Sequence, residues 1–218
     1  MKYHLVVAVA IVAIMGVWIA FEFHGSRPAG LRQFDPDEVA RLDTVMWRSY
    51  YDRERLRLFS QLIELVRQQY HLPLIRSTVA AYEATRAAFV FKEGHSRADY
   101  ERALPNLVTY YGMIEKANDE PFDVEKAARL ELEWWIVHRE KVSHPSGDLE
   151  RSLAMASAEL YHVPAANLME YARLRAEAMV LRDVKAEAGG VSREDWDRIG
   201  QLLQASWRSL WKAINPHS

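Results

Sequence analysis

The first hydrophobic feature of the chain is an uninterrupted apolar run near its amino terminus. Residues 5–21 carry no charge, and Glu22 ends the run. As a helix, these seventeen residues would measure about 25 Å, close to the hydrocarbon core of a bilayer at about 30 Å. A cleaved signal peptide would need a small-x-small site after a shorter run, and neither Ala20 nor Gly25 has a small residue two positions before it. We therefore expect residues 1–24 to form an uncleaved transmembrane signal anchor.

The predicted anchor carries small residues on one side. Ala13, Gly16 and Ala20 lie close to one helical face, and the last two have the spacing that lets membrane helices approach closely. This spacing predicts a packing face for another transmembrane helix; the alternative is that Ala and Gly are simply common in such helices. Four residues precede the apolar run, and the composition is compatible with a bacterial source. We expect a single-pass protein of the bacterial inner membrane with its carboxyl-terminal domain on the periplasmic side.

Behind the anchor, the pattern changes to a linker and then to amphipathic helices. Residues 25–34 contain Gly and Pro and show no periodicity, which predicts a linker. Asp35 and Pro36 form a strong helix start, so we place the soluble domain at residues 35–218. From Val39 to Tyr70 apolar residues recur mostly three or four apart, which predicts one helix of about thirty-five residues and roughly 50 Å.

The remaining segments also have helical periodicity. We predict helices over 73–92, from Ser96 with an interruption at Pro105, from Asp123 to about 140, over 149–161, over 164–187 and from Ser192 onward. Gly94 is expected to end its helix in the left-handed conformation. The last helix has a single apolar seam, formed by Trp196, Ile199, Leu203, Trp207, Leu210 and Ile214. The prediction is an all-α domain of about six to seven helices in a bundle or irregular array.

Composition and charge exclude several classes of protein. Hydrophobic residues make up 50% of the 218 positions, which is enough for a packed core. The net charge of −2 gives no basic footprint, so we expect no nucleic-acid partner. The absence of Cys excludes disulfides, iron–sulfur clusters and cysteine nucleophiles.

A helical domain rich in carboxylates raises the possibility of a dimetal enzyme. Such a site takes Glu-x-x-His from two helices, and Glu159 with His162 is the single pair with that spacing, which chance alone can supply. Glu133 and His138 are the other outside candidates. Glu133 is either a buried acid with a raised pKa or an ordinary surface partner of Arg129. Nucleophile elbows, phosphate loops and zinc motifs are missing from the sequence, so we assign no catalytic residue, cofactor or metal.

Aromatic residues provide the remaining candidates. Trp47, Tyr51, Trp134 and Trp135 are candidate partner-facing residues, although core packing is the more common role of such side chains. Taken together, the anchor and the packed faces predict a membrane-anchored, non-enzymatic accessory, structural or assembly subunit of a larger integral membrane complex, for example a respiratory or photosynthetic one. Its partners would be the bilayer, through residues 5–21, and other subunits. The alternatives are a carboxylate-bridged dimetal enzyme and a tethered ligand-binding sensor.

Overall fold

The computed structural model describes residues 30–216. This part of the chain holds nine α-helices and two short 3-10 helices and contains no β-strand, so the all-α prediction is confirmed. The helices are α2 Pro36–Tyr51, α3 Arg55–Tyr70, α4 Leu74–Glu93, α5 Arg97–Glu101, α6 Leu104–Glu115, α7 Val124–Arg139, α8 Asp148–Tyr161, α9 Met169–Glu187 and α10 Arg193–Ile214. The 3-10 helices are η1 Lys141–Ser143 and η2 Ala165–Leu168.

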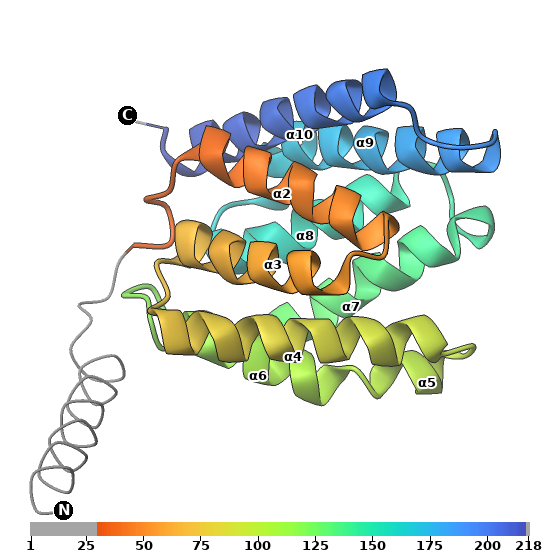
Figure 1. Cartoon of the computed structure of the whole chain (residues 1–218). Helices are drawn as coiled ribbons and strands as arrows, with labels where there is room; N and C mark the ends of the chain where they lie inside the picture. Colours follow the sequence, from red (N-terminus) through yellow and green to blue (C-terminus); the bar gives the residue numbers. More distant parts are fainter. Residues whose placement is uncertain (1–29, 217–218) are drawn as a thin grey trace, which may run out of the picture.

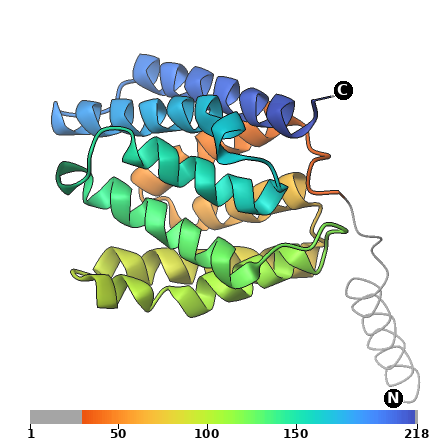
Figure 2. The same cartoon turned by 180° about the vertical axis from the view of Figure 1, so that it is seen from behind.

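The long helices form a closed up-and-down ring. Helices that follow one another along the chain lie side by side and run in opposite directions (Figure 1), with α5 as a short link before α6. The ring closes because α10 packs against both α9 and α2. Figure 2 shows α6, α7 and α8 from the opposite side. The start of α2 and the end of α10 therefore lie at one end of the ring, which we call the base.

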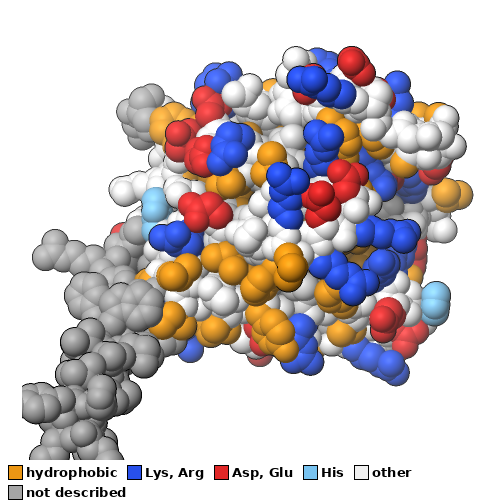
Figure 3. All heavy atoms as spheres, in the orientation of Figure 1, with side chains coloured by type: hydrophobic (Ala, Val, Ile, Leu, Met, Phe, Trp, Pro, Cys, Tyr) orange, Lys and Arg blue, Asp and Glu red, His pale blue; other side chains and the backbone are white. Residues whose placement is uncertain are grey.

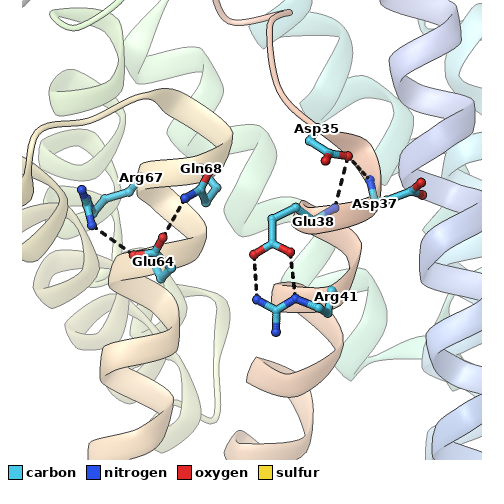
Figure 4. A network of polar contacts seen from close by, with 7 residues as sticks. All are labelled: Asp35, Asp37, Glu38, Arg41, Glu64, Arg67 and Gln68. Atoms are coloured by element: carbon cyan, nitrogen blue, oxygen red, sulfur yellow. Dashed lines mark hydrogen bonds and ion pairs between the residues drawn. The ribbon is translucent and has the colours of Figure 1, made fainter.

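Capping residues begin several helices where the sequence predicts them. The Asp35 carboxylate accepts hydrogen bonds from the amides of Asp37 and Glu38 and thereby caps α2 (Figure 4). One turn later, Glu38 pairs with Arg41 at 2.7 Å. Figure 4 also shows the neighbouring polar group of α3, in which Glu64 accepts hydrogen bonds from Arg67 and Gln68. Ser96, Asp123 and Ser192 cap α5, α7 and α10 in the same way.

The predicted long helix is wrong, because the chain folds back between α2 and α3. Asp52, Arg53 and Glu54 separate the two helices, and Arg53 has a left-handed φ of 60°. The turn lets the two apolar faces pack against each other instead of extending into water. The larger number of helices follows from this break and from Pro105, which begins α6 as a separate helix.

The packed domain begins inside the segment predicted as a linker. Leu31 and Phe34 are buried in the core. Between them, the Arg32 guanidinium donates hydrogen bonds to the carbonyls of Tyr161, at 2.8 Å, and Ile214, at 3.0 Å. These carbonyls end α8 and α10 and would otherwise lack partners, so Arg32 fixes the point at which the chain joins the base.

The predicted anchor lies outside the described residues. Residues 1–24, including Ala13, Gly16 and Ala20, belong to the part of the chain whose structure is not described. Within residues 30–216, none of the helices combines the length and the hydropathy needed to cross a membrane.

Gly94 is required for a reason other than the predicted one. Its φ of −73° is an ordinary value, so it does not adopt the left-handed cap conformation. A Cβ at this position would lie 2.8 Å from the Tyr100 ring. The Arg139 guanidinium stacks 4.0 Å from the centre of the Phe91 ring and donates a hydrogen bond to the carbonyl of Gly94. Gly94 is therefore a site of close packing between α4, α5 and α7.

The apolar seam of α10 is confirmed as a core element. All six of its predicted residues are buried: Trp196, Ile199, Leu203, Trp207, Leu210 and Ile214. Helices α2 and α9 cover this seam from both sides. Deep burial of such side chains is worth about 1.5–3 kcal/mol each before conformational entropy is subtracted.

Candidate functional site

The outside candidates for metal ligation take part in separate structural contacts. The Glu159 carboxylate forms an ion pair with Lys126, with 2.6 Å between Oε2 and Nζ. The Nε2 atom of His162 lies 2.8 Å from the carbonyl oxygen of Pro121. His162 is also the left-handed residue that ends α8. Both residues therefore attach the end of α8 to the segment that leads into α7. Within residues 30–216, no group of three or more His, Asp or Glu side chains is arranged to hold a metal ion.

Glu133 is neither a buried acid nor a partner of Arg129. Its side chain is 38% exposed, and it forms an ion pair with the guanidinium of Arg97 at 2.7 Å. The two residues line a shallow surface depression together with Glu101 and Leu104. The sequence missed this pair because Arg97 lies on α5, which the fold brings against α7.

His138 belongs to a charged cluster that sequence reasoning did not find. The Asp183 carboxylate lies 3.3 Å from His138 Nε2 and 2.9 Å from Lys141 Nζ. Arg182 contacts the same carboxylate at 2.7 Å, and its guanidinium stacks 3.3 Å from the centre of the Tyr51 ring. Although burial opposes ionisation, the contact with His138 and the hydrogen bonds from Lys141 and Arg182 hold the pKa of Asp183 well below its usual range. The cluster joins the ends of α7 and α9 and has no spare carboxylate for a ligand.

A second polar group lies in the middle of the ring. Asp43 of α2 is 1% exposed and pairs with Arg175 of α9 at 2.6 Å. The same carboxylate oxygen accepts a 2.9 Å hydrogen bond from the indole nitrogen of Trp207. The Arg175 guanidinium also lies over the rings of Trp47 and Trp207, at 5.3 and 5.6 Å from their centres. This group connects α2, α9 and α10 through partners far apart in the sequence.

Buried tyrosines form further polar contacts inside the domain, some of them near α6 and α7. The Glu131 carboxylate accepts hydrogen bonds from the Tyr111 hydroxyl and the Trp135 indole, each at 3.0 Å. Burial raises the pKa of Tyr111 well above its usual value. Tyr161 OH accepts a 3.3 Å hydrogen bond from Gln69. These hydrogen bonds, within α7 and between different helices, give the buried polar side chains partners inside the hydrophobic core.

The four candidate partner-facing aromatics lie in or against this core. Trp47 is 8% exposed, and Tyr51 packs 6.3 Å from the ring of Trp196. Trp134 and Trp135 stack edge to face at 6.1 Å and pack against the hydrophobic core. In residues 30–216 these four side chains therefore contribute to the packing of the domain.

Helix α4 has an unusual distribution of side chains. Leu74, Tyr82 and Phe89 are 45%, 51% and 48% exposed. The residues that α4 buries are all small: Ser77, Ala80, Ala81 and Ala87. A helix that faces water on one side normally buries its large apolar residues. Val90 and Phe91 at the end of α4 pack against the core in this way, but the other large apolar side chains of the helix remain exposed to a substantial extent.

The apolar surface of α4 continues onto α3. Ile75 and Val79 on α4 and Phe59 and Ile63 on α3 are partly exposed. Figure 3 shows hydrophobic side chains gathered over α3 and α4, whereas charged groups predominate over α2 and α10. We call Leu74, Ile75, Val79, Tyr82 and Phe89 the outer face of α4. Contiguous apolar surface of this kind is typical of protein contact sites.

The position of this face relative to the base is fixed. Helix α4 begins at the base, directly after the turn at His71, and extends toward the opposite end of the ring (Figure 1). The His71 ring contacts the carbonyl oxygen of Gln33, next to the point where the chain joins the domain. The near end of the outer face therefore lies close to that point.

The described residues thus define a closed ring of antiparallel helices with a hydrophobic core that contains a few buried polar groups, and with large apolar side chains exposed on α4. Comparisons with protein-family models, with curated proteins and with solved structures give no match for this chain.

Proposed function

We propose that this chain is a membrane-anchored, non-enzymatic accessory or assembly subunit that docks within an integral membrane complex through the outer face of α4. The observation that carries the proposal is the exposure of large apolar side chains on α4, because the fully buried residues of this helix are small while Leu74, Tyr82 and Phe89 are about half exposed. A docked partner would cover these side chains.

The free energy available from such docking is substantial. A buried aromatic side chain covers about 150–250 Å², so half-exposed Tyr82 and Phe89 each leave on the order of 100 Å² to be covered. At about 25 cal/mol per Å², this area corresponds to about 2.5 kcal/mol for each residue before the costs of association. Aromatic residues are also enriched among those that dominate binding at protein interfaces.

The proposed anchor would hold this face at a set place above the bilayer. In this proposal, residues 1–24 span the inner membrane and the helical ring lies on the periplasmic side. Arg32 fastens the chain to the ends of α8 and α10, which supports a defined attachment rather than a loose one. A periplasmic reporter fused after Ser218 should be active, and activity restricted to a cytoplasmic reporter would reverse the orientation.

A pair of double variants tests the docking function. The full chain is solubilised in mild detergent and sized as the wild type, as Tyr82→Gln/Phe89→Gln and as Val180→Gln/Val184→Gln. Val180 and Val184 are 46% and 53% exposed on α9, so the second variant removes similar apolar surface from another helix. We expect the wild type and the α9 variant to migrate as a larger assembly and the α4 variant to lose it.

Two results would contradict the proposal. One is migration of the wild type as a single 25.2 kDa polypeptide with its micelle. The other is equal loss of the assembly in the α4 and α9 variants, which would show that the effect does not depend on the outer face of α4.

A further inference from the structure

The outer face of α4 contains a seven-residue repeat. Ile75, Tyr82 and Phe89 are spaced by seven, and Thr78 and Thr85 lie three positions after the first two. The hydroxyls of Thr78 and Thr85 donate to the carbonyls four residues earlier, at 2.8 and 2.7 Å, which leaves their methyl groups for packing. Alternating steps of three and four residues are the spacing with which one helix packs along another.

We propose that the occupant of this face is a second copy of the chain, with the two α4 helices packed side by side in parallel around a twofold axis. This inference rests on the proposed function, because it names the partner of the same face. A twofold interface requires a self-complementary surface. In a parallel pair, Ile75, Tyr82 and Phe89 each meet their own counterpart, so apolar layers face apolar layers.

The residues beside the repeat also favour the parallel arrangement. The residue that directly precedes Ile75 or Phe89 lies at the edge of the contact. In a parallel pair it faces the residue five positions further along the other copy. Leu74 then faces Val79, and Ala88 faces Glu93. These contacts are apolar or place a small residue beside a charged one, so they oppose no like charges. An antiparallel pair would instead place Lys92 against Ile75.

Attachment to a membrane also favours a parallel arrangement of the two α4 helices. Helix α4 begins near the point where the chain joins the base and runs away from it. Two copies held in one bilayer would both present their base toward it, so their α4 helices would run in the same direction.

The size of the face predicts that pairing depends on the anchor. The exposed parts of its five residues amount to a few hundred Å² per copy, which falls short of the roughly 600 Å² that each partner buries at the lower end of standard stable interfaces. Confinement in a bilayer raises the effective concentration and compensates for the small area. The experiment therefore uses the full chain in its membrane.

The chain contains no Cys, so single cysteines report on pairing without a background. The variants Thr78→Cys, Tyr82→Cys and Phe89→Cys are oxidised in membranes and compared with Val184→Cys on α9, which is 53% exposed in the native chain. We expect reducible dimers at all three α4 positions, at least about tenfold above the α9 control, because disulfides need Cα atoms within about 7 Å. Circular dichroism of each variant verifies that the helices are retained.

The other outcomes distinguish this inference from the proposed function. Dimers from Tyr82→Cys without dimers from Phe89→Cys would overturn the parallel arrangement. If no α4 position forms dimers but these thiols are protected from a soluble maleimide, unlike that of Val184→Cys, a different protein covers the face; self-pairing is then refuted and the docking function stands. If the α4 thiols react as fast as the control, both proposals fail.

Discussion

Replacing Arg175 by Met tests the energetic role of the ion pair inside the ring. Arg175 is 13% exposed and Asp43 is 1% exposed, and their atoms are 2.6 Å apart. In Arg175→Met, the methylene chain is kept and the charge is removed. Asp43 then stays buried with the Trp207 indole nitrogen as its remaining hydrogen-bond donor in the described structure.

The expected loss follows from leaving one charge without its partner. Breaking a buried pair by removing one member costs about 3–5 kcal/mol, because the other charge stays in a poorly solvated site. Loss of the contacts with the faces of Trp47 and Trp207 adds to this by about 1 kcal/mol. A domain of this size has a free energy of unfolding of about 5–15 kcal/mol, so the variant should lose a large part of it.

Urea unfolding of the full chain in detergent, followed by tryptophan fluorescence, measures this loss. The matched control is Arg173→Met on the same helix, because Arg173 is 51% exposed and pairs with Glu170 and Glu177 at the surface. Such pairs contribute about 0–1 kcal/mol, so the control should unfold nearly like the wild type. The double variant Asp43→Leu/Arg175→Met removes both charges and should be more stable than Arg175→Met.

Two results would refute this reasoning. A loss below about 1 kcal/mol in Arg175→Met would mean that water or another group solvates Asp43 readily. A double variant less stable than Arg175→Met would mean that the hydrogen bond from Trp207 to Asp43 matters more than the ion pair.

Three further predictions follow from the packing. Burial raises the pKa of Tyr51 to about 12 from 10.0, so the phenol ionises at lower pH in the unfolded chain than in the folded one. The free energy of unfolding is therefore unaffected below pH 10 and falls by up to about 2.7 kcal/mol as the pH rises to 12. Tyr51→Phe should lessen this loss when alkaline unfolding is measured. Gly94→Ala should destabilise by about 1–3 kcal/mol because its Cβ would meet the Tyr100 ring. Gly112→Ala, inside α6, should stabilise by about 0.5–1 kcal/mol, because its Cβ would make only an ordinary contact with Val124; thermal melts compare the two variants. Arg32→Met should cost about 1–3 kcal/mol and speed amide exchange in the last turn of α10, and unchanged exchange would contradict its capping role.

The break between α2 and α3 shows how a periodic pattern can mislead. Apolar residues recur at helical spacing on both sides of it, and neither Gly nor Pro marks the turn. A signal was present, because no apolar residue lies between Tyr51 and Leu56, and the intervening residues are all charged. The prediction gave this short break less weight than the long amphipathic pattern around it. The chain turns there because packing α2 and α3 against each other buries apolar surface.

The candidate site was harder to predict from the sequence than the helices were. Helix α4 carries apolar residues on all its sides, with alanines on one side and large side chains on the other. Periodicity therefore does not indicate which side is buried. The position of α4 between α3 and α6 turned the alanines inward. The aromatics singled out by their abundance, such as Trp47, fill the interior instead.

The sequence by itself determined the all-helical class, most helix starts and the seam of α10, because caps and periodicity depend on residues within a few positions of each other. The residues Asp35, Ser96 and Ser192 act through amides in the next turn, whatever the rest of the chain does. Tertiary structure alone decided that Asp43 meets Arg175, 132 residues away, and that α4 presents its large side chains to the outside. These features depend on which helices become neighbours when the ring closes, and that choice minimises the exposed apolar area of the whole chain rather than of any one segment.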